Sequence, residues 1–367
     1  MTLLVAIIAD DLTGALDTGT PFVEAGLKVA VAIDVDAVGE ALERGPDVIV
    51  INTASRALSA SAAAQQVQAA LAALGPAQPR VLFKKIDSRL KGNVAAESMA
   101  LAEATNRSRI IVAPAIPDQQ RFTINGAVTG RGVETPLPIR SVFPANALAI
   151  DVHDASTDSD LDDLVRQTDW ASVIAVGARG LGSAFARSLA RPAAARLPFP
   201  PSPETLFAFG SRDPITSAQI EHLAGHRLLG AIADAPAGEL PAGSILALPA
   251  VARCSGEQTA NPEHVVSRFA GGVRQVVEQT RPGILMMGGG DTALAILKAL
   301  GAKVLTPNGE IEAGIPWFEI KLMDGRTICC AVKSGGFGTI DSLLKLIPEN
   351  LLSQTTSHRT RIEKQAW

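Results

Sequence analysis

The sequence predicts an α/β protein of two domains, each a mainly parallel sheet flanked by helices, with the active site in the interdomain cleft. Three observations lead to this prediction. Short apolar, often β-branched runs recur, Ala-rich helical stretches separate several of them, and one proline-rich segment divides the series in two. Uninterrupted apolar strands that alternate with helices are typical of parallel sheets covered on both faces. With 367 residues, 47% of them hydrophobic, the chain is long enough to form two cores.

The first series of apolar runs predicts strands at Leu3–Ala9, Val29–Ile33, Val48–Asn52, Val81–Lys85 and Ile110–Pro114. Helices are expected between several of these strands, at Ala60–Leu74 and Ala95–Thr105. A further unit begins at Val152, with a strand at Ser172–Val176 and a glycine-containing turn at Gly177–Gly182. The glycine spacing of this turn does not match G-x-G-x-x-G, so we interpret it as a packing turn.

Proline marks the boundary between the two predicted domains. Arg191–Pro203 contains five prolines in thirteen positions, which is typical of a stiff linker. The second series predicts strands at Leu206–Gly210, Leu228–Ala233, Ser244–Leu248, Gly283–Met287, Trp317–Met323 and Thr327–Val332, the last two joined as a hairpin by Asp324-Gly325. We therefore expect an N-terminal domain at 1–190, a linker at 191–203, a C-terminal domain at 204–352 and a polar tail at 353–367.

The composition excludes several classes of partner. The formal net charge is −4 and no basic patch suited to a phosphate backbone is present, so nucleic acid is not an expected partner. A membrane is not expected either, because the N-terminus is strand-like and no apolar run reaches the ~18 residues of a membrane helix. Three cysteines without metal-ligand spacing to histidine indicate reduced residues of a cytoplasmic protein. The mean hydropathy of +0.22 favours a homodimer.

Two adjacent carboxylates follow the first predicted strand. The strand runs directly into Asp10 and Asp11, and a Thr13-Gly14 turn and an Ala-rich helix come next. Polar groups at the carboxyl end of a strand lie where open α/β sheets bind ligands. Burying two neighbouring carboxylates is costly unless a cation, a ligand hydroxyl or a backbone donor offsets their charge. The alternative is that the pair only caps the next helix, although one aspartate would suffice for that.

Three further polar segments follow strands of the first predicted domain. Lys84–Asn93 combines four cations with a carboxylate, a hydroxyl and an amide, a mixture that suits an anionic, hydroxylated ligand. Arg56 follows another strand and has the guanidinium group that binds a carboxylate bidentately. Arg121 lies just after a fifth strand and is expected near the same edge. Each of these segments, taken alone, also fits an ordinary surface loop.

Glycine-containing loops follow three strands of the second predicted domain, at Gly210–Thr216, Met287–Ala293 and Val332–Gly338. Glycines let backbone N–H groups approach phosphate oxygens, and a helix N-terminus favours the anion. One such loop fits a tight turn equally well, but three in one domain favour a nucleotide site. Neither G-x-x-x-x-G-K-[ST] nor G-x-G-x-x-G occurs, which argues against a P-loop and a Rossmann dinucleotide site.

Five segments in this order resemble the four-carbon acid sugar kinase family: Ala9–Asp17, Lys84–Asn93, Gly210–Gln219, Gly288–Thr292 and Lys333–Gly338. The resemblance spans almost the whole chain. It implies an N-terminal acid-sugar-binding domain and a C-terminal ATP-binding domain that phosphorylate the terminal hydroxyl of threonate, erythronate or a 3-oxo-tetronate. The expected substrate contacts are Asp11, Arg56, Lys84, Lys85, Ile86, Asp87, Ser88 and Arg121. The expected nucleotide contacts are Ser211, Gly288, Gly289, Gly290, Asp291, Thr292, Lys333, Gly335 and Gly336.

The resemblance also suggests how the chemistry is divided. Arg56 and a lysine of Lys84–Lys91 are expected to hold the carboxylate of the acid. Catalysis is expected to use Asp10, Asp11 or Asp87 to accept or orient the attacking hydroxyl. A Mg²⁺ ion is expected beside ATP, with Asp291 or a water-bridged aspartate of the N-terminal domain as its partner, and its full ligand set is left open.

The predicted acid-binding loop departs from the family pattern. The family usually reads Asp-Ser-Thr-Leu-Arg-Gly-Asn, whereas this chain has Arg89 in place of the threonine and Lys91 in place of the arginine. Arg89 adds bulk and charge, and Lys91 loses a bidentate fork. Two other functions remain open on the residues alone. A ligase would form an acyl-phosphate from the same acid and needs no hydroxyl, and a two-lobed sensor would bind the acid without using ATP.

Overall fold

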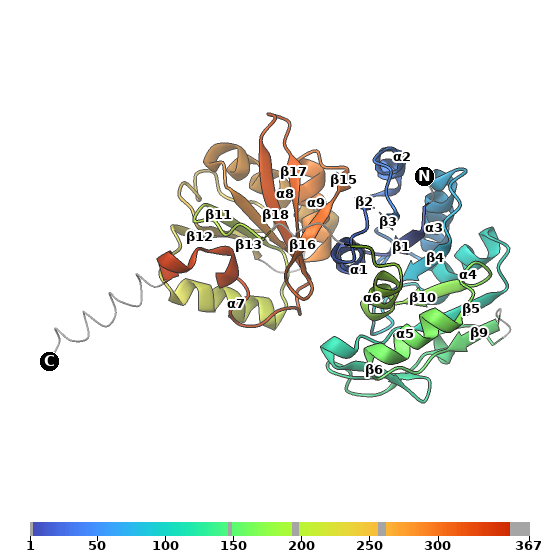
Figure 1. Cartoon of the computed structure of the whole chain (residues 1–367). Helices are drawn as coiled ribbons and strands as arrows, with labels where there is room; N and C mark the ends of the chain where they lie inside the picture. Colours follow the sequence, from blue (N-terminus) through green and yellow to red (C-terminus); the bar gives the residue numbers. More distant parts are fainter. Residues whose placement is uncertain (1–2, 146–148, 193–197, 256–261, 353–367) are drawn as a thin grey trace. The chain divides into compact units, whose positions relative to one another are not determined.

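The computed structural model describes residues 3–145, 149–192, 198–255 and 262–352 (Figure 1). The chain divides into two compact units. Unit 1 comprises Met1–Arg196 with Lys303–Pro307, and unit 2 comprises Leu197–Ala302 with Asn308–Trp367. Residues 193–197 of the predicted linker and the predicted tail at 353–367 lie outside the described residues.

Unit 1 is built on an eight-stranded sheet in the order β15-β2-β3-β1-β4-β10-β5-β9. Neighbouring strands pair in parallel except β15, which is antiparallel to β2. The strands are β1 (Val5–Ala9), β2 (Val29–Ala32), β3 (Val48–Asn52), β4 (Val81–Lys85), β5 (Arg109–Ala113), β9 (Ala149–Val152), β10 (Ile174–Gly177) and β15 (Val304–Leu305). The central strands are buried throughout, which explains their uninterrupted apolar runs.

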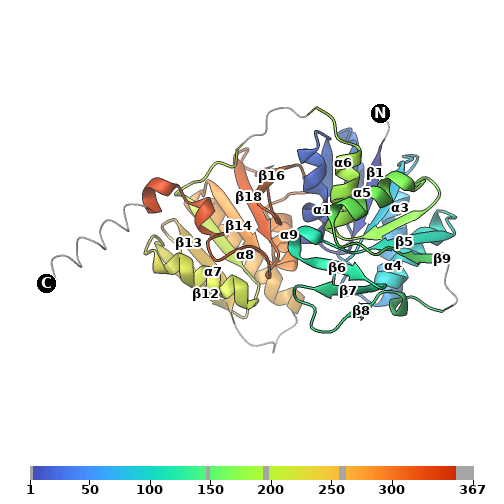
Figure 2. The same ribbon diagram turned by 60° about the horizontal axis from the view of Figure 1, so that its bottom comes forward.

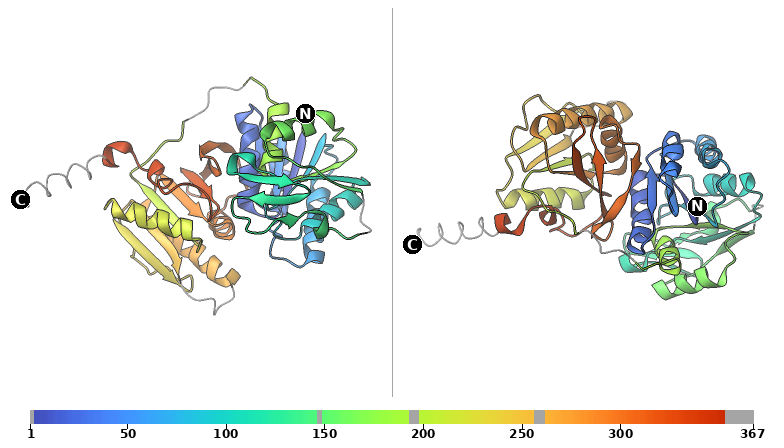
Figure 3. Two further views of the ribbon diagram at one scale, coloured as in Figure 1. Left: turned by 90° about the horizontal axis from the view of Figure 1, so that it is seen from below. Right: turned by 45° about the horizontal axis from the view of Figure 1, so that its top comes forward.

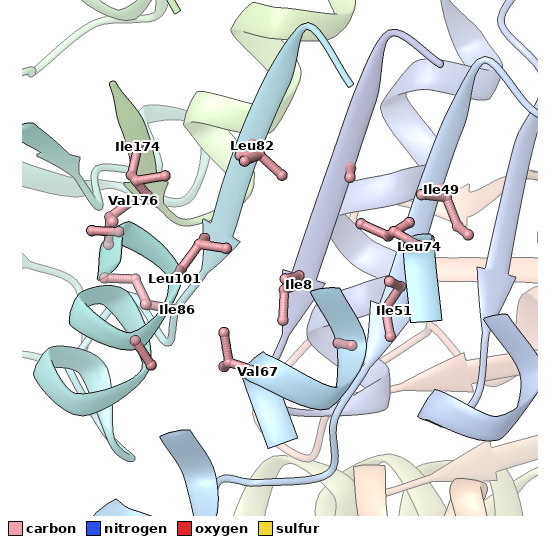
Figure 4. Close-up of a cluster of buried hydrophobic side chains, with 14 of the residues drawn as sticks. Ile8, Ile49, Ile51, Val67, Leu74, Leu82, Ile86, Leu101, Ile174 and Val176 are labelled. Carbon is pink, nitrogen blue, oxygen red and sulfur yellow. The ribbon is translucent and has the colours of Figure 1, made fainter. Parts of the chain in front are cut away.

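Two sets of helices cover the sheet of unit 1. The helices are α1 (Leu12–Glu24), α2 (Val38–Glu43), α3 (Ala60–Leu74), α4 (Val94–Ala104), α5 (Asp158–Gln167) and α6 (Arg179–Ser188). Side chains of α2, α3 and α4 share one hydrophobic cluster with alternate strand residues such as Ile8 and Ile51 (Figure 4). Because strand side chains alternate between faces, Ile7 points to the opposite face. There α1 and α5 both contact α6.

The strand order creates a switch point at β1. The chain leaves β1 toward β2 and β3 on one side, and then continues to β4 on the other side. Ligands of open α/β sheets bind at such points, beyond the carboxyl ends of the strands. The register pairs Ala9 with Asn52 of β3 and with Lys85 of β4. The residues that follow these strand ends, beginning with Asp10, therefore lie along one edge.

A small antiparallel sheet follows β5 in unit 1 (Figure 2). It consists of β6 (Arg121–Ile124), β7 (Ala127–Gly130) and β8 (Leu137–Pro138). These three strands were not predicted from the sequence. Asn125 and Gly126 join β6 to β7 with positive φ angles of 51° and 71°, as a two-residue hairpin turn requires. The Asn-Gly pair was the available sequence signal for this hairpin.

Unit 2, mostly yellow to red in Figure 3, is built on a seven-stranded sheet in the order β12-β13-β11-β14-β18-β17-β16. The first five strands in that order pair in parallel, and β17 is antiparallel to β18, which confirms the predicted hairpin. The strands are β11 (Thr205–Phe209), β12 (Ala231–Pro236), β13 (Ala250–Ser255), β14 (Ile284–Gly288), β16 (Pro307–Glu312), β17 (Ile315–Lys321) and β18 (Thr327–Lys333). The helices are α7 (Pro214–Gly225), α8 (Pro262–Thr280) and α9 (Gly290–Ala299).

The two units share one strand order. Unit 2 runs β12-β13-β11-β14 where unit 1 runs β2-β3-β1-β4, so the first strand lies between the third and the fourth in both. The switch point of unit 2 therefore lies at β11, beside β14. After α9 the chain contributes β15 to the edge of the unit 1 sheet, a return that the sequence did not predict.

The predicted strand at Ser244–Leu248 is wrong. The actual central strand is β13, at Ala250–Ser255. Ile245 is the only buried residue of this run, and Leu246 is 77% exposed, so the run lacks the continuous burial of the parallel strands in this sheet. The β13 sequence contains a single β-branched residue, Val251, and this gave it little strand signal. The packing interpretation of Gly177–Gly182 agrees with the structure, where a Cβ at Gly180 would overlap a carbonyl oxygen.

Candidate functional site

A buried cluster of two aspartates and one arginine follows β1. Nε and Nη2 of Arg56 donate to Oδ2 and Oδ1 of Asp10 at 2.8 and 2.9 Å, and Nη2 also donates to Oδ1 of Asp11 at 2.8 Å. The Asp10 side chain is only 3% exposed. Burial alone would raise the pKa of Asp10, but Lys84, Arg56 and Lys85 outweigh it and lower that pKa. Asp10 is therefore a fixed anion held by Arg56.

Asp11 has a second role at the start of α1. Its Oδ1 accepts the backbone N–H of Gly14 at 3.1 Å, and its Oδ2 accepts the Thr13 hydroxyl. The capping alternative thus applies to Asp11, and Asp10 instead pairs with Arg56. Nε and Nη2 of Arg56 donate to the carboxylates of Asp10 and Asp11. Within the described part of the chain, only its Nη1 has no acceptor, so it has no second pair of donors for a bidentate contact with a ligand carboxylate.

Lys85 ends β4 and lies over the first turn of α1. It is 5% exposed, and its Nζ donates to the carbonyl oxygen of Ile86 at 2.9 Å. A Cβ at Gly14 would lie 2.8 Å from this Nζ and 2.5 Å from Oδ1 of Asp11, so only glycine leaves room for the ammonium group there. An ammonium group has three donors, and no second acceptor for Nζ occurs among the described residues. Lys85 therefore retains donors for an anionic ligand.

Two residues were expected to bind substrate, but their surroundings in the structure contradict that expectation. Lys84 is fully buried, and its Nζ donates to the carbonyl oxygens of Ile8 and Lys85 at 3.2 and 2.8 Å. It also pairs with Glu97 at 3.1 Å, so all three donors are taken. Ile86 lies in the hydrophobic cluster, and its N–H and carbonyl groups are both bonded within unit 1. Both residues support the site from beneath.

The loop after β4 lies against the aspartate–arginine cluster. Asp87 uses Oδ1 to accept the backbone N–H groups of Arg89 at 2.8 Å and Lys91 at 3.4 Å. Gly92 has φ +85°, and a Cβ there would lie 3.0 Å from Oδ2 of Asp10. The loop thus turns back toward β1 because glycine permits this conformation. Among the described residues, Oδ2 of Asp87 has no hydrogen-bond partner.

Ser88 and Arg121 meet beside this loop. Ser88 is buried, and its hydroxyl accepts Nη1 of Arg121 at 2.6 Å. Nε and Nη2 of Arg121 donate to the carbonyl oxygen of Arg131 at 3.2 and 3.0 Å. The structure therefore brings the segment after β5 to the loop after β4, as the sequence predicts.

In unit 2 the three glycine loops meet around Ser211. The register pairs Phe209 with Gly288 and Gly288 with Lys333, so the loops start at one edge of the sheet. A Cβ at Gly210 would overlap the hydroxyl of Thr292, and one at Gly335 would overlap the hydroxyl of Ser211. These close approaches explain why glycine occupies both positions.

The N-terminus of α9 opens at this edge. Its N-cap, Gly289, has φ +96° and no side chain to cap the helix. Gly290, Asp291 and Thr292 form the first turn, in which Asp291 is exposed and Thr292 is buried. The first N–H groups of a helix have no partner within it, and together with the helix dipole they suit phosphate oxygens. Gly336 is exposed at the same edge.

Lys333 and Gly288 lie beneath the glycine loops rather than at their surface, which contradicts their expected contact with nucleotide. Nζ of Lys333 is fully buried and donates to Thr216 Oγ1 at 2.8 Å and to the Gly335 carbonyl oxygen at 3.1 Å. Burial lowers the pKa of Lys333 to about 8. Gly288 is the buried last residue of β14, and a Cβ there would overlap the ring of Phe209. Both residues shape the loops without facing a ligand.

One residue that organises the unit 1 site was not predicted from the sequence. Glu97, on α4, is 1% exposed, pairs with Lys84 and accepts the hydroxyl of Ser55. Ser55 lies next to Arg56, so Glu97 ties the ends of β3 and β4 together. The Ala-rich segment at Val94–Ala104 contains two carboxylates, Glu97 and Glu103, and the sequence does not tell which of them is buried with a charged partner.

Two properties of the described residues concern metals and membranes. No group of three or more His, Cys, Asp or Glu residues there is arranged to hold a metal ion. None of the helices in residues 3–145, 149–192, 198–255 and 262–352 combines the length and apolarity needed to span a membrane.

Known proteins match both units. Residues 5–146 match the family model described as "Sugar-binding N-terminal domain", and residues 247–343 match the one described as "Nucleotide-binding C-terminal domain". The fold and its two polar edges thus define a protein that combines a sugar-binding domain with a nucleotide-binding domain. The chain belongs to the four-carbon acid sugar kinase family.

Curated relatives cover nearly the whole chain. A D-threonate kinase of Cupriavidus necator is 30% identical over 91% of this chain and 94% of its own length. A D-threonate kinase of Salmonella typhimurium is 28% identical over 92% of this chain and 96% of its own length. A 3-oxo-tetronate kinase of Pseudomonas fluorescens is 26% identical over 94% of this chain and 96% of its own length.

Solved structures share the fold. One from Salmonella typhimurium LT2 has a TM-score of 0.72 at 20% identity, and covers 95% of this chain and 100% of that chain. A Haemophilus influenzae protein has a TM-score of 0.65 at 19% identity, and covers 93% of this chain and 98% of that chain. These structures confirm the α/β fold with mainly parallel sheets.

Proposed function

We propose that this protein is an ATP-dependent kinase that phosphorylates the terminal hydroxyl of a four-carbon sugar acid: threonate, erythronate or a 3-oxo-tetronate. The observation that carries the proposal is the combination, in one chain, of a nearly buried ammonium group with spare donors and an uncapped, glycine-lined helix N-terminus. The names of the relatives support the acid class. Because the reaction consumes ATP, we propose that it takes place in the cytoplasm.

The acid would bind at the edge of unit 1. Lys85 retains donors for its carboxylate, and Nη1 of Arg56 offers one more. These groups are nearly or partly buried, so a charge-assisted hydrogen bond there is stronger than one in water. Asp11, whose side chain is 11% exposed, is the aspartate of the cluster more open to a hydroxyl of the acid.

Asp87 is the best candidate for orienting the attacking hydroxyl and accepting its proton. Its Oδ1 is fixed by two backbone N–H groups, while its Oδ2 has no hydrogen-bond partner in the described part of the chain. Asp10 is less suited, because its oxygens bind Arg56 and its pKa is lowered. Phosphoryl transfer depends mainly on positioning and charge neutralisation, so a weak base is adequate.

The glycine loops of unit 2 fit a triphosphate. The first-turn N–H groups of α9 would hold phosphate oxygens, and the missing side chains at Gly210 and Gly335 keep the loops close to one another. Asp291, exposed in that turn, is the candidate partner for Mg²⁺. When bound, ATP supplies the phosphoryl group, and Mg²⁺ offsets the charge of its phosphates.

A coupled ADP-release assay with Mg-ATP tests the proposal. The panel contains both enantiomers of threonate and of erythronate, 3-oxo-tetronates, and a four-carbon acid without hydroxyls. Turnover of one hydroxylated acid but not of the control is expected, and turnover of the control would instead indicate an acyl-phosphate-forming ligase. No ADP release with any acid, together with no binding of ATP, would refute the kinase proposal. Asp87→Asn should lower kcat at least tenfold, and Asp10→Asn should act mainly on stability.

A further inference from the structure

Three arginines from separate segments gather beside the loop that follows β4. Arg89 belongs to that loop, Arg121 begins β6, and Arg131 follows β7. The position that a Cβ of Gly132 would occupy lies 3.6 Å from Nη2 of Arg121 and 3.8 Å from Nη1 of Arg89. Two guanidinium groups thus flank a point that the missing glycine side chain leaves open.

The positive charges of this arginine cluster are poorly offset within the protein. Burial lowers the pKa of Arg121, and Arg89 and Arg131 lower it further, whereas Asp87 acts in the opposite direction. The Asp87 carboxylate is bonded to backbone N–H groups and not to a guanidinium. Among the described residues, the guanidinium groups of Arg89 and Arg131 donate no hydrogen bond and pair with no carboxylate. An anion at this point would relieve the repulsion.

The arginine cluster adjoins the proposed acid site. The hydroxyl of Ser88 accepts from Arg121 at 2.6 Å, and Ser88 is three residues beyond Lys85. Asp87, one residue earlier, raises the pKa of Arg56 and also acts on Arg121. It therefore lies within electrostatic range of both the aspartate–arginine cluster and the arginine cluster. The loop that follows Lys85 therefore carries or contacts this second set of cations.

We propose that Arg89, Arg121 and Arg131 form a subsite for a second anionic group of the acid. The preferred substrate is then a small hydroxy acid with a carboxylate or phosphate besides the carboxylate held at Lys85, and it binds better than a simple tetronate. Planar guanidinium groups suit either anion, because both present paired oxygens. This inference rests on the proposed kinase function and redirects its substrate class.

Titration calorimetry on the intact chain without nucleotide tests the subsite. The probes are tartrate, which has two carboxylates, 3-phosphoglycerate, which has a carboxylate and a phosphate, and threonate, which has one carboxylate. At least one of the two probes with two anionic groups should bind tenfold or more tightly than threonate, and the better of them identifies the second group. Arg89→Thr and Arg131→Gln should each remove most of this preference while changing threonate affinity less than twofold. Arg44→Gln, which removes an exposed arginine that pairs with Glu40 and donates to the hydroxyl of Thr306, is the matched control.

Several outcomes would overturn the subsite. One is equal affinity for threonate, tartrate and 3-phosphoglycerate, and another is a parallel loss of affinity for all three probes in Arg89→Thr. Weaker ATP binding in Arg89→Thr, with acid binding unchanged, would assign the cluster to the nucleotide. The kinase proposal fails separately: Arg89-dependent binding of tartrate or 3-phosphoglycerate without ADP release on any acid would retain the subsite and reject the kinase.

Discussion

Replacing Arg56 by glutamine should destabilise unit 1, because the buried Asp10 carboxylate then loses its bidentate partner. Removing one partner of a buried ion pair costs about 3–5 kcal/mol. The Arg56 side chain is 32% exposed, so water can reach part of the gap, and Lys84 and Lys85 still act on Asp10. We therefore expect a loss of about 2–3 kcal/mol. For a unit of this size, that lowers the melting temperature by about 4–12 °C.

Scanning calorimetry with a double variant separates the ion pair from a general packing defect. Asp10→Asn combined with Arg56→Gln removes both charges and should recover more than half of the loss. Arg44→Gln, at an exposed pair, should change stability by less than about 0.5 kcal/mol. A double variant as unstable as the sum of its two single variants would refute the reasoning.

The pH dependence gives a second readout of the same ion pair. The folded pKa of Asp10 is lowered, so its pairing stabilises the fold fully above the unfolded pKa of about 3.9. That contribution is lost as pH falls through the lowered folded value, because the unfolded state binds the proton first. The free energy of unfolding, measured from pH 6 to pH 2, should therefore decline less steeply in Asp10→Asn than in the parent chain. Identical slopes would show that Arg56 does not hold Asp10 ionised.

Three other predictions concern single positions. Gly14→Ala should raise the KM for the acid at least tenfold, because the added methyl would lie 2.8 Å from Nζ of Lys85. The matched control is Gly39→Ala, since a Cβ at Gly39 would have nothing within 4 Å. Gly335→Ala should raise the KM for ATP at least tenfold and leave that for the acid unchanged, and Gly271→Ala, also with open space around it, should do neither. Since the folded pKa of Lys333 is lowered to about 8, the parent chain should gain up to about 3 kcal/mol of stability between pH 8 and pH 10.4. Chemical denaturation across that pH range should show a smaller rise in the free energy of unfolding for Lys333→Met than for the parent chain.

The sequence predicted the strand ends well because their signal is local. Val48–Asn52 and Val81–Lys85 are apolar runs that stop at polar residues, and β3 and β4 have these bounds. In a parallel sheet such ends meet at one edge, so the Asp10 and Arg56 segments could be expected together before the register was known. The two families of loops, polar in the first half and glycine-rich in the second, predicted the division of chemistry between the units.

The roles of adjacent lysines could not be predicted, because they depend on residues far along the chain. Lys84 and Lys85 are neighbours on one strand, so alternation puts their side chains on opposite faces. It does not tell which face holds an acceptor. Glu97, on α4, takes the charge of Lys84, while Gly14 of α1 leaves room above Lys85. Only the packing of two helices on opposite faces separates a structural lysine from one with donors to spare.

The shared strand order explains why one topology serves two kinds of ligand. In both units the first strand ends at the switch point and a helix begins there, so the residues at that junction decide the chemistry. In unit 1 the N-cap is Asp11, which satisfies the first turn of α1 itself, so we propose that side chains such as Lys85 bind the ligand. In unit 2 the helix after the first strand, α7, is also capped by an aspartate, Asp213. The helix after the adjacent strand, α9, instead has Gly289 as its N-cap and no side-chain cap, so its first backbone N–H groups are the ones we propose for phosphate oxygens. A capping side chain at position 289, in place of glycine, should therefore compete with ATP for the first backbone N–H groups of α9, as an anion would.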